Sequence, residues 1–467
     1  MHLVAIGGSD AGISAALRTR ELDPDCDVTV VVADAYPNFS ICGIPYYVSG
    51  EVTHWRNLAH RTTTDLEATG MHLRLDTVAR RIDVSDHKLL VTDADGREEL
   101  LAYDALVVGT GALPVRPAID GLAGPNALGP SDGVHLLHSM GDTFAVIRTL
   151  EEGSALSALI VGAGYVGLEM ADALSIRGLS VAQIEQLPEV LPTVDPELGT
   201  LVHRQLVENG VALQCATQVR GIERAEEGAP GRLEIRATSK AGETTHFADL
   251  VLVVVGVRPD TELAAAAGAE LGTKGAVAVT RQMRTNLTDV FAAGDCVTTH
   301  HRLVGTTYLP LGTTAHKQGR IAGENALGGN REFAGSLGTQ VVKIFEMAAA
   351  RTGLRDHEAI AAGFDPITVG CEADDHKAYY PDSHRISMRY TGDRKSGQLL
   401  GVQLFGHRHA EIAKRIDIAA VAIFHGMSVD EISDLDLSYT PPLGSPWDAV
   451  QVGAQTWVRE SGNQGGK

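Results

Sequence analysis

The sequence predicts an α/β chain built from two copies of one unit and a smaller α+β region, on three observations. Residues 3–17 and 158–174 share one pattern, an apolar run, a glycine-rich turn and an alanine-rich stretch. A second apolar run follows each copy, at 28–32 and 181–185. After about residue 335 the pattern changes to separate strands. Strand, glycine turn and helix are the unit of a doubly wound sheet, so two copies predict two Rossmann-like dinucleotide-binding domains.

The order of the strands predicts that one domain is inserted in the other. Strands at 106–108 and 252–255 close the two copies, and a strand at 290–293 returns to the first. A long apolar helix is expected at 411–425 in the third region. The expected domains are residues 1–114 with 270–330, residues 150–269, and residues 335–455, followed by a flexible tail at 456–467.

Composition limits the partners and the compartment. The chain has 467 residues and a net charge of −20, which argues against nucleic acid or an anionic membrane as a partner. No apolar run reaches about 18 residues, so no membrane-spanning helix is expected. The chain starts directly with a strand at Leu3, without a signal segment, so a cytoplasmic, reducing compartment is expected.

The five cysteines suggest neither a disulfide scaffold nor a metal site, because none form a C-x-x-C pair or a zinc spacing. They are Cys26, Cys42, Cys215, Cys296 and Cys371.

The second glycine loop carries a complete dinucleotide fingerprint. Gly162 permits the tight turn, Gly164 lets backbone approach a pyrophosphate, and Gly167 lets helix and strand pack closely. The helix N-terminus then receives the negative charge. Glu185 ends the next strand, where an acid accepts from a ribose 2′-hydroxyl and repels a 2′-phosphate. This favours NADH over NADPH.

The first glycine loop is a weaker copy, because Ser9 replaces the middle glycine between Gly7 and Gly12. The acid expected on its second strand is absent at Val32. Asp34 is the nearest candidate, and a plain turn residue is nearly as good an interpretation of it. Asp295 follows the strand at 290–293, where a carboxylate could accept hydrogen bonds from the ribityl hydroxyls of a flavin.

Cys42 is the candidate redox residue. It precedes Gly43-Ile44-Pro45, which could open a helix, and a thiolate at a helix N-terminus is stabilised by the partial positive charge there. The usual fate of a lone cysteine is burial without reactivity, and we assign that fate to the other four. No second cysteine lies within a turn of Cys42, so its thiol chemistry cannot use an internal disulfide.

These residues together resemble the pyridine nucleotide-disulfide oxidoreductase superfamily. More narrowly, the chain is similar to its single-cysteine branch, which holds coenzyme A-disulfide reductases and relatives of NADH oxidase and peroxidase. Besides the two glycine loops, the resemblance rests on Asn38 to Tyr47, Thr110-Gly111, Ala293-Gly294-Asp295, Leu311-Gly312-Thr313, Arg415-Ile416-Asp417 and Tyr439-Thr440-Pro441-Pro442.

The resemblance implies a homodimeric FAD enzyme in which NAD(P)H reduces the flavin and the electrons pass to Cys42. It labels the three domains as FAD-binding, NAD(P)H-binding and dimerisation domains. The implied FAD contacts are Gly7, Ser9, Gly12, Asp34, Val78, Thr110, Gly111, Asp295, Leu311, Gly312 and Thr313. The implied NAD(P)H contacts are Gly162, Gly164, Tyr165, Gly167, Glu169, Glu185 and Gly256.

Tyrosines from the dimerisation domain are implied to line the substrate pocket of the partner subunit. The matches are Tyr439 and one of Tyr379 and Tyr380. Tyr165 matches a family tyrosine that covers the flavin until nicotinamide binds. Glu169 matches a family acid near the nicotinamide.

Three positions depart from the family pattern. Asp10 stands where oxidases and peroxidases carry a histidine in the first glycine loop, and its charge would oppose a nearby thiolate or sulfenate. Ile41 stands where coenzyme A reductases usually have asparagine, and Glu21 replaces a basic residue that contacts coenzyme A phosphate. The remaining candidate phosphate ligands are Arg18, Arg20 and Arg61.

The expected function is an FAD-dependent NAD(P)H:disulfide reductase, similar to coenzyme A-disulfide reductase, with a small-molecule disulfide as substrate and coenzyme A disulfide as one candidate. Three alternatives stay open. They are an NADH oxidase or peroxidase with Cys42 as a sulfenic acid, a reductase of persulfide or another acceptor, and a flavoprotein redox sensor with slow turnover.

Overall fold

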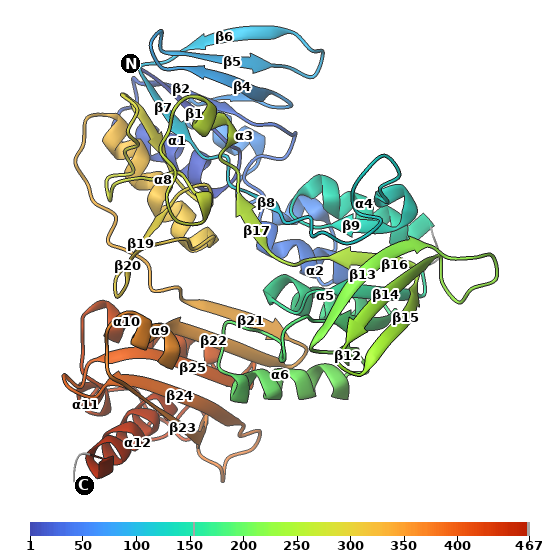
Figure 1. Cartoon of the computed structure of the whole chain (residues 1–467). Helices are drawn as coiled ribbons and strands as arrows, with labels where there is room; N and C mark the ends of the chain where they lie inside the picture. The colour runs from blue at the N-terminus through green and yellow to red at the C-terminus, as the bar shows by residue number, and fades with distance from the viewer. Residues whose placement is uncertain (153–154, 465–467) are drawn as a thin grey trace. The chain divides into compact units, whose positions relative to one another are not determined.

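The structure is a computed structural model that describes residues 1–152 and 155–464 (Figure 1). The chain forms two compact units, and it leaves and re-enters the first of them. Unit 1 holds residues 1–115, 137–144 and 256–336, and unit 2 holds residues 116–136, 145–255 and the chain from 337 onward. The predicted fold class is confirmed, including the insertion of one nucleotide fold in the other.

Unit 1 is built on a five-stranded parallel sheet with the order β18-β7-β1-β2-β3. Its strands are β1 (His2–Ile6), β2 (Asp27–Val31), β3 (His72–Arg74), β7 (Ala105–Val108) and β18 (Val290–Ala292). Strand β7 is buried along its whole length, as expected for a parallel strand covered on both faces.

Two long helices of unit 1 pack backbone against backbone. They are α1 (Asp10–Leu22) and α8 (Gly312–Ala326). A Cβ at Gly319 would lie 2.3 Å from the carbonyl oxygen of Ala11, so only glycine permits this approach. The close contact brings the first turns of the two helices together, where the site described below is found.

The remaining elements of unit 1 are short. Strands β4 (Val78–Asp83), β5 (Lys88–Thr92) and β6 (Glu98–Ala102) form an antiparallel sheet, β8 (Ala112–Pro114) pairs with β17 (Val257–Pro259), and β19 (Thr299–His301) pairs with β20 (Gly305–Thr307). The short helices are η1 (Ile41–Gly43), α2 (Ile44–Ser49), η2 (Trp55–Leu58), α3 (Thr63–Glu67), α7 (Glu262–Ala266) and η4 (Thr273–Gly275).

Unit 2 begins with a second five-stranded parallel sheet, in the order β12-β11-β10-β16-β9. Its strands are β9 (Val134–Leu136), β10 (Ser157–Val161), β11 (Ser180–Ile184), β12 (Ala212–Gln214) and β16 (Leu250–Val253). An antiparallel sheet of β13 (Thr217–Arg224), β14 (Leu233–Ser239) and β15 (Gly242–Ala248) precedes β16, as β4–β6 precede β7. Both sheets thus have the same topology apart from one edge strand. In unit 1 this edge strand is β18, the last of its sheet along the chain, and in unit 2 it is β9, the first of its sheet along the chain.

The helices of this part of unit 2 are η3 (Pro130–Asp132), α5 (Tyr165–Ile176) and α6 (Pro196–Glu208), and helix α4 (Met140–Glu152) begins in unit 1 and ends in unit 2. The C-terminal region, orange to red in Figure 1, is a five-stranded antiparallel sheet with helices. It contains β21 (Gln340–Ile344), β22 (Met347–Gly353), β23 (Pro366–Asp374), β24 (Arg385–Asp393), β25 (Leu399–His407), α9 (Asp356–Ala361), α10 (Ile412–Phe424), α11 (Val429–Ser433) and α12 (Ala449–Gln464).

The predicted flexible tail at 456–467 is wrong for residues 456–464, which belong to helix α12. Trp457 is 4% exposed, and its indole N–H donates to the carbonyl of Ile367 at 2.8 Å. Tyr390 also reaches this helix, through a hydrogen bond from its hydroxyl to the carbonyl of Val450 at 2.9 Å. Residues 465–467 of the predicted tail lie outside the described residues.

The predicted boundaries of the second nucleotide domain also differ from the structure. Residues 256–269 were expected in it, but they belong to unit 1, because β17 pairs with β8. Residues 116–136, which the prediction placed in no domain, belong to unit 2, because they supply strand β9.

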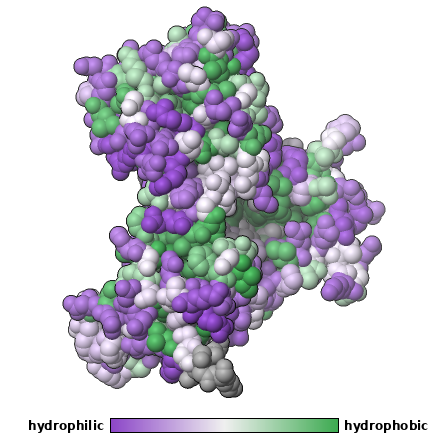
Figure 2. All heavy atoms as spheres, turned by 60° about the vertical axis from the view of Figure 1, so that its left-hand side comes forward, coloured by the Kyte–Doolittle hydropathy of each residue, from purple (hydrophilic) through white to green (hydrophobic). Residues whose placement is uncertain are grey.

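On the face drawn in Figure 2, hydrophilic residues cover most of the surface and hydrophobic residues form smaller areas between them. None of the helices in residues 1–152 and 155–464 is long and apolar enough to cross a membrane.

Candidate active site

The first glycine loop, residues 7–12, joins β1 to α1 in unit 1. Gly7 has a φ of +108°, and its N–H donates to the carbonyl of Val31 at 2.9 Å. A Cβ at Gly12 would lie 2.1 Å from the carbonyl oxygen of Gly7, so the helix can start here only with glycine. Ser9 is the N-cap residue of α1, and its side chain makes no capping hydrogen bond. The free N-terminus of this helix is a suitable anion site.

At the end of β2 the residue next to this loop is Val32. A Cβ at Gly8 would lie 2.4 Å from Cγ1 of Val32, so an apolar side chain packs under the loop. Asp34 accepts a hydrogen bond from the N–H of Tyr36 at 2.9 Å, which supports its interpretation as a turn residue. Val78 follows Thr77, whose N–H donates to the carbonyl of Val32 at 2.9 Å. Val78 therefore lies beside the end of β2.

Asp295 lies near Asp10, in the turn that follows β18. Burial, together with the charge of Asp10, raises the pKa of its carboxyl to about 6. The backbone N–H of Leu311 donates to the same carboxyl, and Gly312 and Thr313 follow at the start of α8. Asp10, Asp295 and the first turn of α8 are therefore neighbours in space.

Thr110 and Gly111 follow β7 at the same edge of the sheet. The Thr110 hydroxyl donates to the carbonyl of Asp260 at 2.6 Å, and the carbonyl of Gly111 accepts from the N–H of Asp260 at 3.0 Å. Gly111 has a φ of +74° and open space where a Cβ would lie.

These residues fit an FAD. One buried polar atom among the described residues supports this: Oδ1 of Asn38, which is 1% exposed, has no hydrogen-bond partner. The N–H of Asn38 donates to the carbonyl of Gly8 at 2.6 Å, so this acceptor stands beside the glycine loop. A helix N-terminus for the pyrophosphate, a carboxylate for hydroxyls and an unused acceptor are the groups that a dinucleotide needs.

The cysteine turn, residues 40–43, places Cys42 on the surface of unit 1. Cys42 lies in η1, directly before the six-residue helix α2. The N–H of Ser40 donates to the carbonyl of Leu58 at 2.8 Å, which fixes the turn from one side. Phe39 stacks on Trp55 with ring centroids 5.5 Å apart, which fixes the chain before the turn.

Cys42 is the exposed cysteine of the five. Burial raises the pKa of each of the others, to about 12 for Cys215 and about 11 for Cys371. Cys26 and Cys296 are fully buried, and their pKa values are raised for the same reason. These four stay protonated at neutral pH, and no disulfide occurs among the described residues.

The second glycine loop, residues 162–167, has the same framework in unit 2. Gly162 has a φ of +105°, and its N–H donates to the carbonyl of Ile184 at 2.8 Å. A Cβ at Gly167 would lie 2.2 Å from the carbonyl oxygen of Gly162. The middle glycine, Gly164, has nothing within 4 Å of its Cβ position. Open space at this position is what a pyrophosphate approaching the backbone requires.

Glu185 is 6% exposed and is bound to the loop it serves. One carboxylate oxygen accepts from the N–H of Ala163 at 2.7 Å, and the other accepts from the N–H of Leu187 at 2.8 Å. Each oxygen retains a second lone pair for a ribose hydroxyl.

Tyr165 and Glu169 lie on the first turns of α5. The Tyr165 hydroxyl accepts from the Thr193 hydroxyl at 3.2 Å, and burial raises the pKa of the phenol, with the charge of Glu169 contributing. Gly256, also predicted at the NAD(P)H site, directly follows Val255, whose Cγ1 would lie 3.4 Å from a Cβ at Gly162.

The three predicted tyrosines lie on the surface of unit 2. Tyr379 is 74% exposed, Tyr439 is 45% exposed and Tyr380 is 43% exposed. Desolvation and a hydrogen bond with Tyr379 raise the pKa of Tyr439. Tyr380 instead meets the ring of His376 edge to face at 5.9 Å. The structure therefore pairs Tyr379, rather than Tyr380, with Tyr439.

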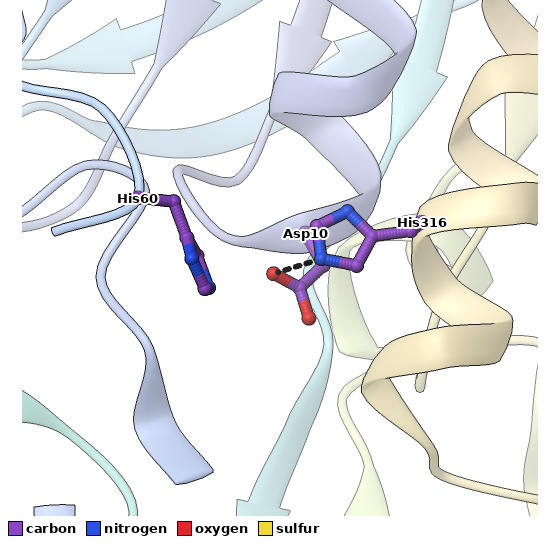
Figure 3. A group of neighbouring side chains, drawn as sticks. All are labelled: Asp10, His60 and His316. Carbon is purple, nitrogen blue, oxygen red and sulfur yellow. Dashed lines mark ion pairs between the residues drawn. The ribbon is translucent and has the colours of Figure 1, made fainter. Parts of the chain in front are cut away.

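The structure changes the environment expected for Asp10. His316, which the sequence analysis missed, places Nε2 3.1 Å from Oδ1 of Asp10 (Figure 3). No local motif joins a residue of the first loop to one in α8, so only the packing of α1 on α8 reveals this pair. The charge of Asp10 consequently faces an imidazole.

Two of the three candidate phosphate ligands are engaged within the protein. Arg18 forms ion pairs with Glu324 at 2.6 Å and with Glu21 at 2.9 Å. Arg20 donates to the carbonyl of Thr69 at 2.8 Å. Arg61 is exposed.

Comparisons with known proteins agree with this geometry. Residues 1–319 match the pyridine nucleotide-disulphide oxidoreductase family, and residues 339–449 match its dimerisation domain. The chain is 33% identical to an NAD(P)H sulfur oxidoreductase (CoA-dependent) of Pyrococcus furiosus, over 96% of this chain and 97% of that protein. It is 30% identical to an NADH oxidase of Methanocaldococcus jannaschii, over 99% of this chain and 100% of that protein.

A solved structure gives the same result. The structure of an NAD-dependent persulfide reductase from A. fulgidus aligns with a TM-score of 0.91 and 35% identity, over 99% of this chain and 84% of that one. The chain is therefore a flavin-dependent NAD(P)H oxidoreductase that belongs to the pyridine nucleotide-disulphide oxidoreductase family.

Proposed function

We propose that this enzyme reduces the sulfur–sulfur bond of a small disulfide or persulfide, with Cys42 as the redox-active sulfur and coenzyme A as the candidate thiol carrier. The observation that carries the proposal is the contrast among the cysteines. Cys42 is exposed in the flavin-type domain, whereas burial holds the other four as thiols. The coenzyme A dependence in the name of the P. furiosus relative supports the choice of carrier.

The chemistry balances with one cysteine. The Cys42 thiolate attacks one sulfur of the substrate, the substrate S–S bond breaks, and one thiol leaves while a mixed disulfide forms on Cys42. When bound, FAD supplies the electron pair of NAD(P)H to this site. Two electrons and two protons then convert the mixed disulfide to a second free thiol and Cys42. One NAD(P)H and one proton are consumed for each disulfide.

We assign the preference for NADH to Glu185. Its buried carboxylate stands at the end of β11 and is oriented by the N–H groups of Ala163 and Leu187. A negative charge held at this point accepts from a ribose 2′-hydroxyl and repels a 2′-phosphate.

We also propose a homodimer in which Tyr379 and Tyr439 serve the Cys42 of the partner subunit. The match to a dimerisation domain supports the dimer. Next to Tyr439 the chain exposes Leu443 at 79% and Trp447 at 56%, apolar surface that a second copy would cover.

Mixed dimers test the shared site. A dimer of one Cys42→Ser chain and one Tyr439→Phe chain contains one intact site if cysteine and tyrosine come from different chains. Activity well above that of either parent homodimer is expected. Activity no higher than the Tyr439→Phe homodimer would argue for a site made within one chain.

An acceptor panel tests the proposed reaction. Flavin-loaded enzyme with NADH is expected to reduce coenzyme A disulfide or coenzyme A persulfide at least 100-fold faster than cystine. Cys42→Ser is expected to abolish this turnover while NADH still reduces the flavin, and Cys215→Ser is the matched control that keeps it. Undiminished turnover in Cys42→Ser would refute the proposal. Oxygen uptake near one O₂ per two NADH, as fast as any disulfide turnover, would establish an oxidase instead.

A further inference from the structure

Three side chains from distant parts of unit 1 converge beside the first glycine loop. Asp10 begins α1, His60 follows η2, and His316 lies in the second turn of α8 (Figure 3). One ligand atom of each residue lies within 4.8 Å of the corresponding atoms of the other two. One carboxylate and two imidazoles are a donor set that zinc and related divalent ions bind.

The distances suit a shared ion. Oδ1 of Asp10 lies 3.1 Å from Nε2 of His316, and the ring centroids of His60 and His316 are 6.1 Å apart. Two ligands that each lie about 2.0–2.2 Å from one tetrahedral zinc are separated by roughly 3.3 Å. The Asp10–His316 pair therefore needs little movement, and His60, which is exposed, can complete the set from the solvent side.

The second nitrogen of His316 is also engaged as a metal site requires. Nδ1 of His316 lies 3.0 Å from the hydroxyl oxygen of Ser14, which is 8% exposed on α1. A metal-bound imidazole commonly hydrogen-bonds through its other nitrogen to a protein oxygen, which fixes the ring orientation. Ser14 holds His316 with Nε2 directed at Asp10.

The local charge favours a cation. Asp10 and Asp295 are close enough for the charge of Asp10 to raise the pKa of Asp295. An FAD pyrophosphate at the N-terminus of α1 would add further negative charge to the same region. A divalent ion bound to Asp10 offsets this charge, and it takes the place of the direct ion pair between Asp10 and His316.

We propose that Asp10, His60 and His316 form a binding site for one divalent transition-metal ion, with Zn²⁺ as the preferred ion and water in the open fourth position. The sequence predicts no metal site, because its five cysteines lack a zinc spacing and these ligands form no local motif.

The site has a physical connection to the cysteine turn. The N–H of His60 donates to the carbonyl of Asn38 at 2.9 Å, and the N–H of Ser40 donates to the carbonyl of Leu58 at 2.8 Å. A metal ion that fixes His60 therefore restrains the chain that carries Cys42. Bound Zn²⁺ is expected to slow the alkylation of Cys42 by iodoacetamide.

Equilibrium dialysis of the flavin-loaded enzyme against Zn²⁺, with metal content measured by mass spectrometry, tests the site. One ion per chain is expected. Asp10→Asn, His60→Gln and His316→Gln are each expected to weaken binding at least 10-fold, with the flavin absorbance per chain recorded to confirm that each variant is loaded. Ser14→Ala is expected to weaken binding less, since it removes only the support of His316.

The chain offers a matched control. Glu189, His203 and Cys215 form another group of three possible ligands, in unit 2. His203→Gln is expected to leave the proposed site intact. No binding by the wild type, binding unchanged in both His60→Gln and His316→Gln, or loss of the ion in His203→Gln would each overturn the proposal. X-ray absorption must show only nitrogen and oxygen neighbours of the zinc ion. A sulfur neighbour at about 2.3 Å that is lost in Cys215→Ser would instead place the ion at Glu189, His203 and Cys215 and overturn the proposal.

Discussion

The two glycine loops share a backbone framework but differ at the positions that face a ligand. In both, the first glycine has a φ near +105° and donates its N–H to the strand alongside. The last glycine of each loop would place a Cβ 2.1 or 2.2 Å from the carbonyl of the first. Steric contact within the loop thus dictates the repeated residues, and this requirement is the same whatever the loop binds.

The ligand-facing positions have diverged. In unit 2, Glu185 binds the loop through Ala163, whereas in unit 1 the residue after β2 is Val32, which packs under Gly8. The carboxylates at the first loop stand elsewhere: Asp10 lies within the loop itself, and Asp295 approaches it from a distant segment. The acid at the second loop therefore comes from the strand that follows that loop, whereas the first loop combines an acid of its own with one that tertiary packing brings in.

The largest expected effects come from breaking each framework separately. Gly12→Ala and Gly167→Ala each force a Cβ onto a backbone carbonyl, at a cost of about 3 kcal/mol or more. Gly12→Ala is expected to yield protein without flavin. Gly167→Ala is expected to keep the flavin, measured by absorbance, and to lose its rapid reduction by NADH in stopped flow.

Gly164→Ala is the control for this pair, because it lies in the same loop and has open space at its Cβ position. It is expected to fold and to retain flavin. Equal loss of flavin in Gly12→Ala and Gly167→Ala would mean that the two folds do not act independently.

The second effect is a pH dependence of opposite sign in the two folds. The folded pKa of Asp295 is about 6, above the usual unfolded value near 3.9, so the folded state binds this proton more tightly. The free energy of unfolding of flavin-free protein should therefore fall as the pH rises from about 4 to 6, by on the order of 3 kcal/mol. Asp295→Asn is expected to remove this slope in urea denaturation.

Asp249 in unit 2 gives the comparison. Burial alone would raise the pKa of its carboxyl, but hydrogen bonds from Leu156 and Ser157 lower it overall. Its stabilisation is present above the unfolded pKa and is lost as the pH falls through the folded one. Asp249→Asn should therefore destabilise the protein at pH 7, whereas Asp295→Asn should not. If both variants lowered the free energy of unfolding at pH 7, the predicted difference between Asp249 and Asp295 would be contradicted.

A third, smaller effect concerns the local acid of the second loop. Glu185→Gln is expected to raise the KM for NADH about 10-fold, which corresponds to about 1.4 kcal/mol, and to narrow the preference over NADPH by a similar factor. Steady-state kinetics with both nucleotides measure this. Glu189→Gln, nearby in the chain, is the control that should leave the ratio unchanged, and a preference unaffected by Glu185→Gln would remove Glu185 from the ribose site.

The smallest effects are expected where the loops exchange their middle residues. Ser9→Gly should change the free energy of unfolding by only a few tenths of a kcal/mol, since the Ser9 side chain makes no capping bond. Gly164→Ser should leave the unfolding free energy within about 0.5 kcal/mol but raise the KM for NADH several-fold, because its side chain enters open space. A large stability loss in either variant would show that the middle position belongs to the framework.

Local patterns predicted the fold and the position of Cys42, because strand, glycine turn and helix are encoded in neighbouring residues. The prediction failed where one distant contact decides the outcome. Trp457 anchors a helix in a segment whose composition resembles a tail. The pairing of β17 with β8 moves a domain boundary, and His316 reaches Asp10 only through the packing of two helices. The sequence did not decide whether Tyr379 or Tyr380 is the partner of Tyr439, because spacing alone does not distinguish two adjacent tyrosines.

The role of a single exposed cysteine is tested most directly by locating the substrate on the protein. Flavin-loaded enzyme is mixed with coenzyme A disulfide without NADH, quenched in acid, digested and examined by peptide mass spectrometry. We predict one coenzyme A adduct per active site, on the peptide that contains Cys42, which disappears when NADH is added before the quench. An adduct on Cys26, Cys215, Cys296 or Cys371, or a disulfide between Cys42 and one of these residues, would contradict the account.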